Sequence, residues 1–140
     1  MPESRFYAKA VAGWPALLAR LIALSEAPAD RLAIILGDTA RLASLGTPEE
    51  NPSAAELLAW SHVRPPLWAA KTALFLLVQM PRRPAPESEE ERAAWAYLWL
   101  RLRPRESLVD AIAALPEYLR TMLADDLDQA WRDQISQRLV

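Results

Sequence analysis

The fold of this chain is decided by residues 65–80, which read Pro-Pro-Leu-Trp-Ala-Ala-Lys-Thr-Ala-Leu-Phe-Leu-Leu-Val-Gln-Met. The segment from Ala73 to Val78 has no polar residue, so a helix built from it would have no face suited to water. The double proline favours a helix start, because the first helical turn needs no backbone N–H donor, and Pro81 ends the helix. The sequence therefore predicts a central helix that other helices cover on every face, with Phe75 in the core.

The composition is that of one helical domain. The chain has 140 residues, a usual length for a single domain, and 52% of them are hydrophobic. Alanine, leucine, arginine and glutamate are abundant and only three glycines occur, a mixture that favours helices. We expect an all-α fold in which residues 1–140 form one domain, an irregular bundle of about six or seven helices.

Two local features refine the expected bundle. Trp68-Ala69-Ala70 and Trp95-Ala96-Tyr97 each lie in a predicted helix that ends at a Pro-Arg pair, an echo that would suit stacked helical hairpins. Residues 81–87 contain three prolines and two arginines, and we expect them to form an extended surface loop within the domain.

The chain carries little equipment for catalysis or metal binding. It has no cysteine and a single histidine, His62, so thiolate sites and two-histidine sites are excluded. Its three glycines stand alone, which excludes the common phosphate-binding loops. The densest acidic group comprises Asp125, Asp126, Asp128 and Asp133. Its spacing does not match a calcium loop, so we expect a solvated helix face, and we predict a protein that is not an enzyme and uses no metal or cofactor.

A second acidic group follows Ser88. The run Ser88-Glu89-Glu90-Glu91 has the pattern of a capping box, in which the serine and the third glutamate satisfy backbone N–H groups at a helix start. Negative charge is also favourable there because of the helix dipole. Helix capping therefore accounts for these glutamates without a role in acid-base chemistry.

Arginines concentrate between residues 82 and 105, close to several aromatic residues. Those that could form a nucleic-acid surface are Arg82, Arg83, Arg101, Arg103 and Arg105. Arginine with aromatic side chains suits phosphate contact and base stacking. The net charge of −2 supplies no general attraction for nucleic acid, so such binding would require these arginines to converge on one exposed face. A helical subunit associated with nucleic acid is the alternative hypothesis, and a solvated flank is the simpler explanation.

Six tryptophans and a long C-terminal apolar stripe favour binding to a protein partner. Aromatic residues are enriched in cores and at protein interfaces, and six are many for a small core. The last part of the stripe comprises Trp131, Ile135 and Leu139. We predict that these residues bind a partner protein or a second copy of the chain, because uncovered apolar patches are rare on monomers. In the alternative, Trp14 and the first helix fold back to cover them.

These observations predict a non-catalytic helical adaptor or small subunit that binds a protein partner through an exposed apolar or aromatic surface. The longest apolar run is far shorter than the roughly 20 residues of a membrane span, so no membrane association is expected. The first ten residues do not have the pattern of a signal peptide, and the abundance of arginine and alanine suggests a bacterial source. We expect a cytoplasmic protein.

Overall fold

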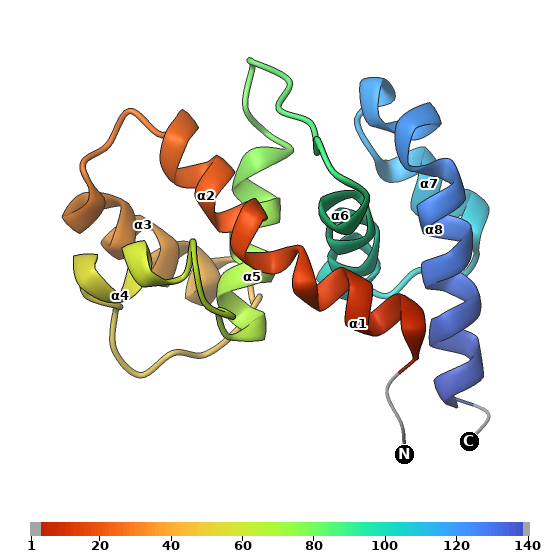
Figure 1. Ribbon diagram of the computed structural model, residues 1–140, viewed down its shortest axis with the longest axis horizontal. Coiled ribbons are helices and arrows are strands. Elements are labelled where there is room, and N and C mark those ends of the chain that lie inside the picture. The colour runs from red at the N-terminus through yellow and green to blue at the C-terminus, as the bar shows by residue number, and fades with distance from the viewer. Residues whose placement is uncertain (1–3, 139–140) are drawn as a thin grey trace.

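The computed structural model describes residues 4–138, and that range contains helices but no strands (Figure 1). The helices are α1 (Arg5–Ala12), α2 (Trp14–Leu24), α3 (Ala29–Leu42), α4 (Ala54–Ala59), α5 (Leu67–Leu77), α6 (Glu89–Leu102), α7 (Leu108–Ala114) and α8 (Glu117–Arg138). Gly13 alone separates α1 from α2, so these two form one bent helix. With α1 and α2 taken together, the described range contains seven separate helices. The predicted all-α multi-helix bundle is confirmed.

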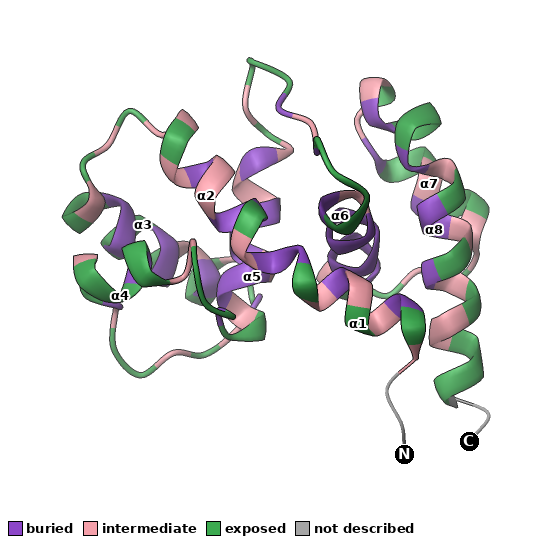
Figure 2. Cartoon of the chain, viewed as in Figure 1, coloured by how far each residue is buried: buried purple, intermediate pink, exposed green. Residues whose placement is uncertain are grey.

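The centre of the bundle is α6. Its residues are buried without interruption from Ala93 to Leu100, and α1, α2, α5 and α8 all pack against it. Figure 1 shows α6 end-on between α5 and α8, and Figure 2 shows it as a largely buried ribbon. Three alanines in this run leave room for neighbouring helices to approach closely. One face of the first turn stays exposed, because the glutamates gather there.

The prediction that the helix of residues 65–80 is covered on every face is wrong. In α5, Ala73, Leu74 and Leu77 are buried against α2, α3 and α6. Phe75 and Val78 are only partly buried. The reason is that no helix covers the remaining side of α5, which instead forms the wall of a groove.

Gly13 brings the bent α1–α2 helix directly onto the start of α6. A Cβ atom at this position would collide with the backbone carbonyl of Glu90. Gly13 itself is buried and its φ is −89°, so close approach rather than backbone conformation explains the glycine. Any larger residue would push two central helices apart.

The Pro-rich segment 81–87 contains no helix and is anchored to the bundle. Pro84 and Pro86 are buried, and the hydroxyl of Tyr118 in α8 donates a hydrogen bond of 2.7 Å to the carbonyl of Pro84. Arg83 has a positive φ of 54° and its guanidinium lies 6.0 Å from the centre of the Tyr118 ring. The loop is therefore at the surface but held in place by the first turn of α8.

One helical stretch in residues 4–138, Arg5–Leu24, is long and apolar enough by composition to cross a membrane. Core helices of soluble proteins meet the same criterion. Phe6, Trp14 and Leu17 in this stretch are buried, and the stretch packs against α5 and α6. Its most apolar window is 33% buried, so packing in the core accounts for only part of its apolar composition.

Candidate binding groove

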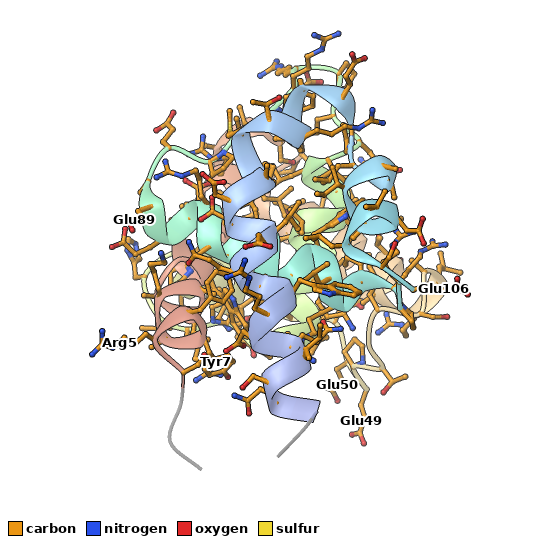
Figure 3. All side chains as sticks on the ribbon, turned by 90° about the vertical axis from the view of Figure 1, so that its right-hand side faces the viewer. Arg5, Tyr7, Glu49, Glu50, Glu89 and Glu106 are labelled. Carbon is orange, nitrogen blue, oxygen red and sulfur yellow. The ribbon has the colours of Figure 1, made fainter. Side chains whose placement is uncertain are left out.

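An open groove with a volume of about 480 Å³ lies where α5 and α6 end and α7 meets α8. Its apolar lining comprises Phe75, Val78, Trp99, Leu102, Ala113, Ala114, Leu115 and Pro116. Its polar lining comprises Gln79, Arg103, Arg105, Glu117 and Arg120. In Figure 3, Glu106, which follows α6, and Glu89, at the start of α6, lie on opposite sides of the view. The groove is at the C-terminal end of α6, because Leu102, Arg103 and Arg105 line it. The groove thus combines an apolar floor with a predominantly cationic rim.

Side-chain hydrogen bonds to backbone carbonyls hold the α7 wall of this groove. The indole Nε1 of Trp99 donates to the carbonyl of Ala111 at 2.9 Å, which ties α6 to α7. The Nε and Nη2 atoms of Arg120 donate to the carbonyls of Leu115 and Ala113 at 3.1 and 3.0 Å. These bonds satisfy carbonyl groups that the end of a helix leaves without partners. The short helix α7 is therefore fixed to both α6 and α8.

Arg105 is placed against the floor of the groove. Its guanidinium carbon lies 5.6 Å from the centre of the Trp99 ring, within the range of a cation–π contact. Its Nε atom is buried and has no hydrogen-bond partner within residues 4–138. A buried donor without an acceptor costs free energy, and the placement of the guanidinium over Trp99 imposes that cost on Arg105.

The predicted arginines do not all converge on one face. Arg103 and Arg105 line the groove, and Arg83 borders a neighbouring depression that shares Pro116 and Glu117 with it. Arg82 pairs with Glu26 of the segment after α2, at 3.5 Å. The guanidinium of Arg101 lies 4.8 Å from the centre of the Tyr97 ring instead. The structure adds Arg120, which sequence reasoning missed because it lies 15 residues beyond Arg105 and reaches the groove only through the turn between α7 and α8.

The residues predicted to bind a partner have different surroundings. Trp131 is partly buried and packs against the core, whereas Ile135 is 39% exposed. Leu139 lies outside the described residues. Helix α1 packs beside α8 (Figure 1), as the alternative prediction required, but the ring of Trp14 lies against Tyr97, with 6.2 Å between ring centres. The predicted role of this stripe in partner binding therefore stays a prediction.

The prediction of a wholly solvated acidic face on α8 is wrong for Asp126. This residue is 8% exposed, and its carboxylate lies 3.9 Å from Nε of Arg92. Burial raises the pKa of Asp126 above its usual value, and the positive charge of Arg92 opposes that shift. Asp125 is exposed, and Asp128 pairs with Arg132 at 3.1 Å as helix spacing allows. Within residues 4–138 no group of three histidine, cysteine or acidic residues could hold a metal ion.

Glu91 has a structural role that its sequence context did not reveal. Ser88 caps α6 as predicted, accepting a hydrogen bond from the N–H of Glu91, but the Glu91 carboxylate accepts one from the N–H of Glu87 at 3.1 Å. It also accepts two hydrogen bonds from Arg20 of α2, at 2.5 and 2.8 Å, and one from Nε1 of Trp95 at 3.2 Å. The hydrogen bond with Glu91 is the largest cause of the raised pKa of Arg20. Because Arg20 and Glu91 are 71 residues apart, no local pattern indicated this pair.

A second surface feature lies at the other end of the molecule, where α3 and α4 pack together (Figure 1). Six of the nine large apolar side chains that are exposed in the described range come from this end. They are Ile34, Ile35, Leu42, Leu58, Val63 and Leu67. The sequence pattern did not distinguish these residues from core residues, because helical spacing alone does not show which side of a short helix finds a neighbour.

Comparison of the chain with protein-family models, with curated proteins and with solved structures found no match.

Proposed function

We propose that this chain is a non-catalytic helical adaptor or small subunit, and that it binds a segment of a partner protein in the groove between α5, α6, α7 and α8. The observation that carries this proposal is the groove itself. Its volume lies within the range of about 300–1,000 Å³ in which proteins take up ligands the size of a few side chains. Its floor offers aromatic and aliphatic side chains, and arginine and aromatic residues are enriched where interfaces bind tightly.

The chemistry of the groove supports binding rather than catalysis. Its lining contains no hydroxyl, thiol or imidazole group. His62 is exposed and follows α4, a helix that contributes nothing to the groove. A set of nucleophile, base and orienting group therefore cannot be assembled from the lining residues.

The experiment that tests this function is selection of binding peptides from a random library displayed on phage. The full-length chain is the bait, and each selected peptide is measured against a variant whose groove is blocked. Ala114→Trp is suitable because Ala114 is exposed and lines the groove. Ala55→Trp is the matched control, since Ala55 is an exposed alanine on α4. We expect peptides that bind the wild type and the Ala55 variant equally and lose binding to the Ala114 variant. Selected peptides that tolerate the blocked groove, or no binding peptide at all, would overturn the proposal.

We also propose a class of partner and a cellular location for the protein. A partner protein is the expected ligand, and a cytoplasmic location in a bacterium is consistent with the composition. Binding of nucleic acid is the alternative proposal, because Arg103 and Arg105 lie next to the same apolar floor. Binding of a single-stranded oligonucleotide at low salt, lost on replacing these two arginines, would favour that alternative.

A further inference from the structure

The groove carries an excess of positive charge that the protein does not neutralise. Three arginines and one glutamate line it, namely Arg103, Arg105, Arg120 and Glu117. Elsewhere in residues 4–138, five arginines have a carboxylate within 4.0 Å: Arg20, Arg41, Arg82, Arg92 and Arg132. None of the groove arginines has such a partner in that range, although Glu117 shares the same lining. Arg5, Arg31, Arg64, Arg83 and Arg101 have none in that range either, so the groove is distinguished by holding three such arginines next to one apolar floor. The groove therefore favours a ligand that supplies negative charge.

We infer that the segment bound in the groove is acidic and amphipathic, and that it places a carboxylate on Arg105 and Arg103 beside a large apolar side chain on Phe75, Val78 and Leu102. This inference rests on the proposed function and names the chemistry of the partner. Arginine presents several N–H donors in a fixed plane and matches a carboxylate through two parallel hydrogen bonds. The contact of Arg105 with Trp99 restrains that plane before the ligand arrives, which lowers the entropy lost on binding.

The position of Arg105 explains why one ligand should supply both the carboxylate and the apolar side chain. Its guanidinium lies over the Trp99 ring among the lining residues, so a carboxylate that contacts its Nη atoms lies inside the groove. A ligand group at that depth also meets the apolar floor. Phe75, Val78 and Leu102 are each partly buried and partly open, so they can lose further apolar surface to the ligand.

The same geometry favours a peptide over a nucleic acid. Base stacking needs an open aromatic face, but Trp99 is only 7% exposed and Arg105 lies over its ring. The remaining aromatic residue of the lining, Phe75, is partly open, but no second open aromatic ring stands beside it for successive bases to stack on. An aliphatic or aromatic side chain next to an acidic one matches this combination.

The test uses the full-length chain and the tightest peptide from the library selection. That peptide is made in two forms, with its acidic residues intact and with each of them replaced by the corresponding amide. Affinities are measured by calorimetry for the wild type, for an Arg103→Gln/Arg105→Gln variant and for an Arg82→Gln/Arg101→Gln variant. The last removes the same charge from positions outside the groove. Arg103→Gln alone guards against misfolding, because Arg103 is exposed.

The inference expects selected peptides to be enriched in aspartate or glutamate next to a large apolar residue. The amide peptide and the groove double variant should each bind about 10-fold or more weakly, and the Arg82/Arg101 variant should bind nearly as the wild type does. Arg103→Gln alone should also weaken binding measurably. Combining the amide peptide with the groove variant should add little further loss, because both changes remove the same contact.

Three other results would overturn the inference. Peptides that need the open groove, as shown by Ala114→Trp, but bind equally well in their amide form would leave the proposed function intact and refute the acidic ligand. Equal losses from the groove variant and the Arg82/Arg101 variant would show a general charge effect instead. An oligonucleotide that binds through Arg103 and Arg105, where no peptide does, would replace the peptide with nucleic acid and overturn the proposed function as well.

Discussion

Replacing Glu91 by alanine should destabilise the protein more than replacing any other charged residue of α6. The Glu91 carboxylate is 3% exposed and accepts hydrogen bonds from Arg20, from Nε1 of Trp95 and from the N–H of Glu87. It joins α2 to α6 at the point where Gly13 brings the two helices together. Alanine would leave the indole N–H and the guanidinium of Arg20 without their principal acceptor.

The expected loss follows from how far each partner is buried. Removing one member of a buried ion pair typically costs about 3–5 kcal/mol, because the other charge is left without a partner. The side chain of Arg20 is 18% exposed, and its Nη2 atom lies 3.6 Å from the carboxylate of Glu87. In the Glu91→Ala variant, water and Glu87 would therefore partly compensate the charge of Arg20. We therefore expect a loss of free energy of unfolding of about 3 kcal/mol, at the lower end of that range. For a domain of this length such a loss lowers the melting temperature by about 10 °C.

Urea denaturation followed by circular dichroism would measure this loss, and a double-mutant cycle with Arg20→Met would isolate the pair. The coupling free energy should be about 1.5–3 kcal/mol. Glu89→Ala is the matched control, because Glu89 pairs with Lys9 at 3.3 Å but its side chain is 66% exposed. That variant should lose less than about 1 kcal/mol. A loss below about 1 kcal/mol for Glu91→Ala, together with a coupling near zero, would refute the argument that burial makes this pair important.

Two further predictions concern burial. Leu77→Ala should cost about 2–5 kcal/mol in urea denaturation because Leu77 is 0% exposed, whereas Phe75→Ala should cost less than the roughly 3–5 kcal/mol typical of a fully buried phenylalanine. A full loss at Phe75 would contradict its place in an open groove. Because burial raises the pKa of Asp126 above its usual 3.8, the folded protein binds this proton more tightly than the unfolded chain does. The wild type should therefore lose stability relative to Asp126→Asn as the pH rises from 3.8 through the raised pKa, and an Asn variant that is less stable at neutral pH would show that pairing with Arg92 outweighs desolvation.

Local signals in the sequence determined the helical class and most helix boundaries. Ser88 caps α6, and prolines separate the helices where they were expected, because capping and the missing proline N–H act within a few residues. The loop at residues 81–87 follows from the same local chemistry. The groove arginines Arg103 and Arg105 could also be singled out as functional candidates, since their clustering near aromatic residues is visible along the chain.

Tertiary structure alone decided which helix is central, which charges are buried and where the groove lies. Residues 65–80 and α6 are both apolar enough for the centre, and only the packing of α1 and α8 on α6 settles the choice. The pair of Arg20 with Glu91 and the approach of Arg92 to Asp126 join segments far apart in sequence. Arg120 lines the same groove as Arg105 only because the turn at Pro116 folds α8 back beside α7. Such contacts depend on how helices pack in three dimensions, and helical periodicity carries no information about the partner that each face meets.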